Sequence, residues 1–189
     1  MNSTHVPKGL SDIHLRLLTA ADAPAYQALR NDMLGCAPTA FTSDLAACAA
    51  LPASHCAARL GTPEDAGFFI VALNASGRLR GCVGCERARR TKERHRAAVV
   101  GMVVMPAAQG QGVGRQLLAA CVAQALRMHG VQQPDLTVTA GSTSAAHLYE
   151  AAGFRVRGSH PNATVVDAVA FDKLHMQMRL APCLNESLE

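Results

Sequence analysis

The chain has 189 residues, of which 49% are hydrophobic and 17% charged, a composition that is typical of a folded globular protein and excludes an intrinsically disordered one. Its net charge of +4 is mild, so it favours an anionic ligand without requiring one. No apolar run approaches the roughly 18 residues of a membrane span, and the first residues lack the apolar stretch of a signal peptide. We therefore expect one domain, residues 1–189 with a core at about 13–180 between short flexible tails, that works in the cytoplasm away from membranes.

The cysteines predict neither disulfides nor a metal site. Their number, seven, is odd and they are scattered, which makes a poor disulfide framework and predicts reduced thiols. Cys82 and Cys85 form a C-x-x-C motif, but no second pair and no histidine pair accompanies it, as a zinc site would require. Positions three apart on a strand also point to opposite faces. We therefore interpret both as core residues.

The N-terminal part of the chain predicts a strand followed by helices. Apolar and polar residues alternate over Ile13–Leu17, and Thr19 or Asp22 can cap the helix that follows. The alanine-rich segment Phe41–Leu60 is typical of helix, with a break near Pro52.

The middle of the chain predicts three strands. Phe68–Leu73 is a continuous apolar run, Asn74–Gly77 is a turn, and Leu79–Ala88 returns as the hairpin partner. Ala97–Met105 is a further apolar strand, and Pro106 ends it.

The C-terminal part predicts alternating helices and strands, without an internal repeat or a linker. The expected elements are a helix at Gly114–Met128, a strand at Leu136–Thr139, a helix at Ser144–Ala151, and closing strands at Phe154–Val156 and Leu174–Leu180. The fold class expected from this order is one mixed α/β domain.

Three glycines, Gly110, Gly112 and Gly114, stand between a predicted strand and a predicted helix. The first amides of a helix have no partner inside it, and the helix dipole adds about half a positive charge there, so the turn suits an anion. A P-loop would need lysine and Ser/Thr after the last glycine, and a dinucleotide motif would need G-x-G-x-x-G instead of G-x-G-x-G. Asp135 lies near the distance of that motif's acidic residue but precedes a strand, so both nucleotide interpretations are weak.

The segment Val104–Leu118 resembles the acetyl-CoA-binding motif of the GNAT N-acetyltransferases, [RQ]-x-x-G-x-[GA], extended on both sides. The matching positions are Gln109, Gly112 and Gly114. Downstream, Ala145–Phe154 is similar to the family's A-x-x-L-Y-x-x-x-G-F segment. The order of elements agrees over residues 13–180, so the resemblance covers nearly the whole chain.

The resemblance implies a strongly twisted mixed sheet of about six to seven strands with flanking helices, splayed where acetyl-CoA lies as cosubstrate. Edge groups of Met102 and Val104 would pair with the pantetheine amides, and a backbone N–H near Val104 would polarise the thioester carbonyl. Ser142 stands where the family often has an asparagine, so this contact would be lost or carried by water. Ala145 completes the coenzyme set. The pyrophosphate would meet the backbone of Gln109, Gly110, Gln111, Gly112, Val113, Gly114 and Arg115.

Tyr149 matches the position that acts as general acid toward the leaving thiolate in many family members; the alternative is an aromatic that packs helix onto sheet. The general base is open, because Ala97–Met105 has no acid where many relatives carry a glutamate. The candidates are Glu86, His95, Asp172 and His175, or a water chain.

We therefore expect an acetyl-CoA-dependent N-acetyltransferase, with a CoA-binding regulatory module without turnover as the alternative. The acceptor would be a small-molecule amine or a protein or peptide amine, in a pocket formed by Phe41–Leu60 and a loop at Gly158–Asp172. The basic run Arg87–Arg96 is most often a solvated loop, so we expect no nucleic-acid partner, while an acidic acceptor or partner protein stays open there. A homodimer also stays open.

Overall fold

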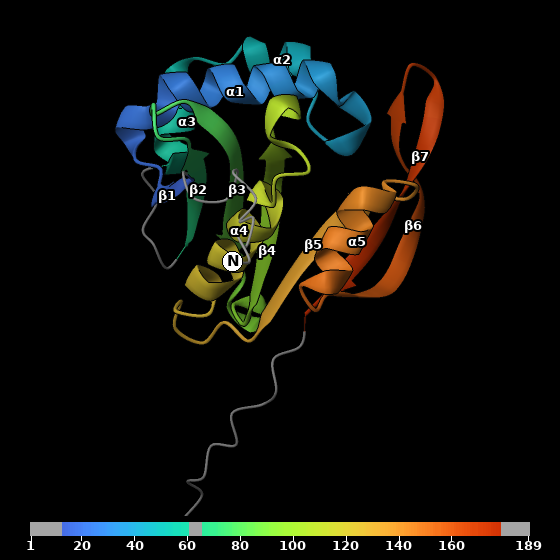
Figure 1. Cartoon of the computed structure of the whole chain (residues 1–189). Coiled ribbons are helices and arrows are strands. Elements are labelled where there is room, and N and C mark those ends of the chain that lie inside the picture. The colour runs from blue at the N-terminus through green and yellow to red at the C-terminus, as the bar shows by residue number, and fades with distance from the viewer. Residues whose placement is uncertain (1–12, 61–65, 179–189) are drawn as a thin grey trace, which may run out of the picture.

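The computed structural model describes residues 13–60 and 66–178. Seven strands form one sheet in the order β1-β2-β3-β4-β5-β7-β6 (Figure 1). All neighbouring strands are antiparallel except β4 and β5, which are parallel. The strands are β1 (His14–Leu17), β2 (Gly67–Leu73), β3 (Leu79–Arg87), β4 (Arg96–Val104), β5 (Gln133–Thr139), β6 (Arg155–Val166) and β7 (Val169–Gln177).

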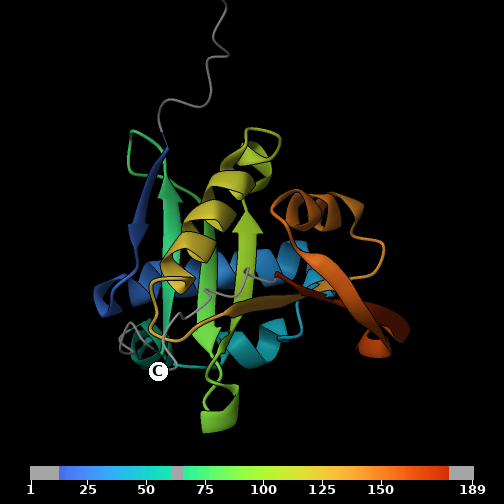
Figure 2. The ribbon, with the colours of Figure 1, turned by 90° about the horizontal axis from the view of Figure 1, so that it is seen from below.

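Helices cover both faces of this sheet. The α-helices are α1 (Ala23–Cys36), α2 (Leu45–Ala49), α3 (Ala53–Leu60), α4 (Val113–Ala125) and α5 (Thr143–Ala151). The short 3₁₀ turns are η1 (Ala20–Asp22), η2 (Pro38–Ala40), η3 (Thr91–Glu93) and η4 (Pro106–Ala108). In Figure 2, gold α4 crosses one face of the strands while blue α1 lies on the other. No helix within the described residues is long and apolar enough to span a membrane.

Two hydrophobic clusters result, because alternate residues of a strand point to opposite faces. Phe68 and Ile70 of β2 pack with the α4 cluster, whereas Phe69 packs with α1 and α3. The two cysteines of the C-x-x-C motif divide in the same way: Cys85 lies in the α4 cluster and Cys82 in the α1 cluster. Both are buried and free, which agrees with their interpretation as core residues.

The sheet divides between β4 and β5. These two strands pair only at three positions, from Arg96 opposite Gln133 to Ala98 opposite Asp135. Beyond these positions they diverge, and Figure 1 shows β4 and β5 close at one end and apart at the other. The guanidinium of Arg96 bonds the carboxylate of Asp135 at 2.7 and 2.9 Å, across the end that stays paired. Asp135, considered above as a nucleotide residue, thus has a structural partner.

The C-terminal strands are much longer than predicted. The expected loop at Gly158–Asp172 is instead most of a hairpin, in which β6 and β7 pair as far as Val166 and Val169. Asp167 and Ala168 turn the chain with positive φ. The prediction was wrong because the hairpin extends past the body: Val165 is 66% exposed, so no alternation of buried and exposed residues marks these strands in the sequence.

Several boundaries also shift. Helix α4 ends at Ala125 instead of Met128, and β5 begins at Gln133 instead of Leu136. β7 ends at Gln177, and the last predicted residue, Leu180, lies outside the described part of the chain. These shifts do not alter the order of elements.

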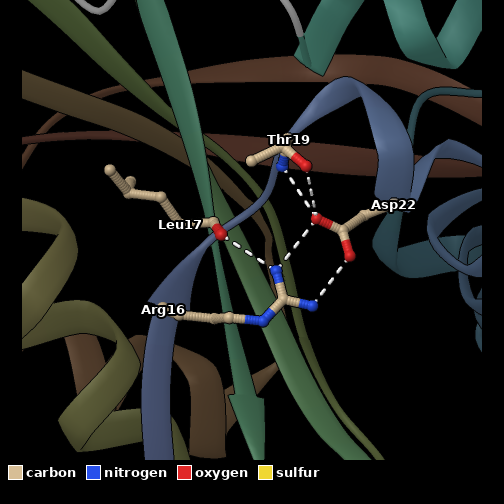
Figure 3. Close-up of polar contacts among 4 residues, drawn as sticks. All are labelled: Arg16, Leu17, Thr19 and Asp22. Atoms are coloured by element: carbon tan, nitrogen blue, oxygen red, sulfur yellow. Dashed lines mark hydrogen bonds and ion pairs between the residues drawn. The ribbon is translucent and has the colours of Figure 1, made fainter.

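A charged cluster fixes the start of α1 (Figure 3). The Asp22 carboxylate accepts two hydrogen bonds from the Arg16 guanidinium, at 2.7 and 2.9 Å. It also accepts the backbone N–H and hydroxyl of Thr19, at 2.8 and 3.0 Å. Asp22 therefore turns back toward β1 instead of capping the amides of α1. The Arg16 guanidinium holds the pKa of Asp22 well below its ordinary range.

Asp22→Asn should lower the free energy of unfolding by about 1 kcal/mol at neutral pH, because it removes the charge that four donors share. A depressed carboxylate pKa stabilises the fold above the unfolded-state value of about 4 and loses that effect as pH falls toward the folded-state pKa. The gap between wild type and variant should therefore narrow below about pH 4. Urea denaturation at neutral pH and below about pH 4 measures the free energy of unfolding of both proteins.

Asp32→Asn is the matched control, since Asp32 is an exposed carboxylate within α1 itself. Two results would contradict the stabilising role of the Asp22 carboxylate. One is an equal loss of unfolding free energy in both variants, and the other is a difference between wild type and Asp22→Asn that grows in acid.

Candidate functional site

A cleft of about 190 Å³ lies where β4 and β5 diverge. It brings together four residues singled out by sequence: Met102 of β4, Ser142 before α5, and Ala145 and Tyr149 of α5. The rest of its wall comes from the turn after α1, from β4, from β5 and from β7. The divergence of the two strands thus creates the space, and α5 lines it.

The β4 edge that faces the cleft is shaped by a bulge. Val100 lies opposite Gly84 and Val103 opposite Cys82, so β4 carries one more residue than β3 between these pairs. Gly101 sits in this bulge with φ +58°, a conformation that favours glycine. The bulge therefore interrupts the regular ladder between β4 and β3 beside the residues that line the cleft.

At the end of β4, backbone groups alternate between the edge that pairs with β3 and the edge that faces the cleft. The Met105 N–H donates to the carbonyl of Arg80 on β3, at 2.9 Å. Neighbouring residues of a strand face opposite edges, so Val104 faces the cleft edge. Its carbonyl accepts the Gln109 side-chain amide at 3.1 Å, which ties the glycine turn to the strand.

The glycine turn leads directly into α4. Gly110 and Gly112 have φ +73° and +76°, and Gly112 is the residue at the N-cap. The first helical amide bond is donated by Gln116 to Gly112, at 3.1 Å. The amides of Val113, Gly114 and Arg115 precede it and have no acceptor within the helix, which leaves them for an anion.

Gly114 has a different role from the other two glycines, because its φ is not positive. A Cβ there would lie 3.3–3.5 Å from side-chain atoms of Leu148, Val104 and Met102. The helix thus approaches β4 and α5 closely at the mouth of the cleft. A larger side chain would fill the space between these elements.

Arg80 supplies a positive charge that the sequence did not reveal. Its guanidinium donates to the carbonyl of Ala107 at 2.8 Å and approaches the Gln111 side chain at 3.4 Å. Gln111 donates to the same carbonyl at 2.9 Å. Arg80 comes from β3, far from the motif in the chain, so only the fold brings it to the glycine turn. Arg115 lies instead in a groove between α4 and α5.

Tyr149 is 7% exposed and packs edge-on against Phe154, with ring centroids 6.1 Å apart. Burial raises the pKa of its hydroxyl to about 12. The hydroxyl makes no hydrogen bond to any of the described residues. Tyr149 therefore both packs the helix and presents a protonated hydroxyl to the cleft, so the two roles weighed from sequence are compatible.

Lys173 also lines the cleft, and sequence reasoning missed it. It is 4% exposed, and its ammonium donates to the Thr139 hydroxyl at 2.7 Å and approaches the carbonyls of Thr39 and Ala40 at 3.4 Å. Burial lowers its pKa. A lysine in a strand of mixed polarity carries no signal of burial. Its contacts connect η2 to β5 and β7.

The four candidate bases are dispersed. Glu86 of β3 binds Arg59 and faces a second cavity on the α1 side of the sheet. His95 precedes β4, at its paired end. The Asp172 carboxylate accepts the Asn162 N–H at 2.9 Å, and the His175 ring stacks on His160. Of the four, Glu86 lines a cavity, the one on the α1 side.

The basic run is partly structural. The Arg87 guanidinium donates to the carbonyls of Arg94 and His129, at 2.7 and 2.6 Å, and Arg96 binds Asp135. Within residues 13–60 and 66–178, no group of three or more His, Cys, Asp or Glu side chains could hold a metal ion.

The sequence pattern of the acetyltransferase (GNAT) family matches residues 26–154, which include β4, the glycine turn and α5. The chain belongs to this family. The match spans more than half of the 189 residues and contains both motifs on which the resemblance rested.

Solved structures of GNAT proteins share the fold. A GNAT-family acetyltransferase from Streptococcus pneumoniae is 20% identical, with a TM-score of 0.80 over 89% of this chain and 100% of that one. A GCN5-related N-acetyltransferase from Kribbella flavida is 26% identical, with a TM-score of 0.75 over 93% and 100%. A phosphinothricin acetyltransferase from Sinorhizobium meliloti, solved with acetyl-CoA, is 22% identical, with a TM-score of 0.77 over 90% and 89%.

The protein is thus a GNAT acetyltransferase with the twisted mixed sheet that the resemblance implied, and acetyl-CoA is its cosubstrate. The described residues around the glycine turn and the cleft fit acetyl-CoA. The free helical amides and Arg80 suit a pyrophosphate, and Gly114 keeps open the space that a side chain would fill.

Gly114→Val should abolish measurable acetyl-CoA binding, because its methyl groups would enter the space between Leu148, Val104 and Met102. Gly112→Val should do the same by another route, since a branched residue at φ +76° strains the turn by about 1–2 kcal/mol. Isothermal titration calorimetry measures the affinity.

Gly158→Val is the control, because a Cβ at Gly158 meets nothing within 4 Å. A folded Gly112 or Gly114 variant that bound acetyl-CoA as tightly as the control would show that the turn does not hold the pyrophosphate.

Proposed function

We propose that this GNAT protein transfers the acetyl group of acetyl-CoA to a primary amine by direct attack within a ternary complex. The observation that carries the proposal is the cleft between β4 and β5, which Met102 and Tyr149 line. The glycine turn adjoins it, because a Cβ at Gly114 would lie 3.5 Å from the Met102 side chain. A protein that only bound the coenzyme would not need a buried, protonated hydroxyl beside the reactive end.

The coenzyme contacts follow from the edges described above. The amides from Gln109 to Arg115 bind the pyrophosphate, and the outward backbone groups of Met102 and Val104 pair with the pantetheine arm. Because Gln109 occupies the Val104 carbonyl, the Val104 N–H is the group left for the coenzyme. Ser142 and Ala145 form the opposite wall at the start of α5.

The transfer forms a C–N bond and breaks a C–S bond, while the amine loses one proton and the sulfur gains one. Acetyl-CoA supplies the activated acetyl group and the thiol that leaves. Tyr149 keeps its proton on Oη across the physiological pH range, since its pKa is about 12, and is positioned to donate it to the sulfur. Burial of the hydroxyl also keeps bulk water from competing for this step.

The proton of the amine has a less direct route. Strand β4 has no carboxylate, and Glu86 of β3, opposite Ala98 of β4, lines the cavity on the α1 side of the sheet. We assign it as the candidate acceptor of this proton, directly or through water. The missing β4 carboxylate is also what favours the second candidate function, a CoA-binding module without turnover.

Release of CoA thiol in the presence of a panel of amines separates the two functions. An acetyltransferase releases CoA at a rate that depends on the amine, and mass spectrometry finds the acetylated product. Tight acetyl-CoA binding without acetylation of any amine would favour the module.

Tyr149→Phe should lower kcat by about 100- to 10,000-fold, the usual contribution of one general acid–base group. The ring and its packing on Phe154 remain, so acetyl-CoA affinity and Tm should change little. Steady-state kinetics beside a melting curve measure both.

Tyr26→Phe is the matched control, since Tyr26 is the other tyrosine, is equally buried, and packs on Phe69 outside the cleft. A Tyr149→Phe variant with the kcat of the control across the pH range would return Tyr149 to a packing role.

A further inference from the structure

Lys173 is the charged side chain that lines the cleft between β4 and β5 among the described residues. It lies on β7 opposite Thr139 of β5 and is 4% exposed. A lysine is rarely buried to this extent unless an acidic group pairs with it, because an ammonium loses its hydration on burial. A buried cation in the wall of a ligand cleft therefore points to a partner that the fold itself does not supply.

The partners that the fold gives Lys173 are all neutral. Its ammonium donates to the Thr139 hydroxyl at 2.7 Å and approaches the carbonyls of Thr39 and Ala40 at 3.4 Å. Burial lowers its pKa, and no carboxylate of the described residues forms an ion pair with it. The adjacent Asp172 points to the opposite face of β7, and its carboxylate accepts a backbone N–H of β6. The positive charge thus has no counter-ion within residues 13–60 and 66–178.

The ammonium is held in place but retains capacity to donate. It has three N–H groups, and the bond to Thr139 uses one of them. The two approaches at 3.4 Å lie beyond the usual length of a hydrogen bond. The Thr139 hydroxyl donates in turn to the Thr39 carbonyl at 2.6 Å, so this chain of bonds fixes the ammonium at the cleft wall. An anion in the cleft would replace a long neutral contact with a short, charge-assisted hydrogen bond.

The proposed coenzyme contacts leave this wall of the cleft unused. They lie on the β4 edge, at Ser142 and Ala145, and at the glycine turn, where the charged pyrophosphate binds. The acetyl thioester end of the coenzyme carries no negative charge. Lys173 belongs to the wall that it forms with Phe41 and Thr42 of the turn after α1. In a ternary complex the remaining molecule is the acceptor, so an anion at Lys173 belongs to the acceptor.

We infer that the acceptor is a small amino acid and that Lys173 binds its carboxylate while its amine faces the acetyl thioester. The inference rests on the proposed acetyl transfer and adds the substrate class to it. The cleft volume of about 190 Å³ lies below the roughly 300–1,000 Å³ of most ligand sites, which favours a compact acceptor. One carbon joins the amine and the carboxylate of an α-amino acid, so both groups lie within the same cleft.

Matched pairs of acceptors test the substrate class: alanine against ethylamine, serine against ethanolamine, and leucine against 3-methylbutylamine. The members of each pair differ only in the carboxylate. With the wild-type protein and saturating acetyl-CoA, kcat/KM should be about 10- to 100-fold higher for the amino acid, the span of one charged hydrogen bond. The preference should appear mainly in the KM of the acceptor.

A second measurement on the wild-type protein uses a carboxylate that cannot react. 4-Methylpentanoate is leucine without its amine, and it should inhibit leucine acetylation competitively. 4-Methylpentanamide has nearly the same shape without the charge, so it should inhibit at least about tenfold less strongly.

Lys173→Met should reduce the ratio of kcat/KM between amino acid and amine by about tenfold or more, because it removes the charge and keeps an unbranched side chain. Lys173→Arg should retain part of the preference, since the positive charge remains. A merely structural lysine would instead lower both members of each pair equally. Lys92→Met is the matched control, because Lys92 is an exposed lysine that does not line the cleft. A melting curve for each variant verifies folding.

Equal kcat/KM for both members of every pair, or equal inhibition by 4-methylpentanoate and 4-methylpentanamide, would overturn the substrate class while acetyl transfer stands. A preference that persists in folded Lys173→Met, or that Lys92→Met reduces as much, would overturn the role of Lys173. A folded protein that binds acetyl-CoA but acetylates no amine would overturn the proposed function itself, and this inference with it.

Discussion

The separation of β4 from β5 is the constraint on which the rest of the molecule depends. Parallel strands normally satisfy each other's backbone groups along their length, but these two pair at only three positions. Every polar group beyond that point must find another partner. Gln109 donates to one carbonyl of the open edge, that of Val104. The Arg96–Asp135 pair holds the closed end, so the opening occurs at a fixed place.

The cleft follows from this geometry, whereas the cavity on the α1 side has no wall from β4 or β5. Helix α5 crosses beside the open strands and closes one side with Tyr149, while α1 and α3 cover the other face and bring arginines together. Lys173 fastens η2 to the ends of β5 and β7, which fixes the turn that the two cavities share.

The sequence predicted the family and the fold well, because two contiguous motifs have a spacing that can be read directly. The residue contacts to the coenzyme stay a prediction. It did not predict groups that act through long-range contacts. Arg80 and Lys173 lie in strands without distinctive patterns. The sequence also does not show which way the arginines of the basic run point. In the fold, Arg87 binds a backbone carbonyl, Arg96 binds Asp135, and Arg89 lines the cavity on the α1 side. The β6–β7 hairpin was missed for a related reason, since exposed strands lack the burial that produces an alternating pattern.

The extra residue in β4 puts the two halves of that strand out of phase. Before it, Ala97 and Val99 point toward α4; after it, Val104 does, and Val103 points toward α1. Odd-numbered side chains thus change sides at Gly101. Loss of this one glycine would leave the strand's composition almost unchanged, yet it would exchange inner and outer residues along the whole open edge. The identity of the groups that face the cleft is therefore encoded in the number of residues in β4 as much as in their chemistry.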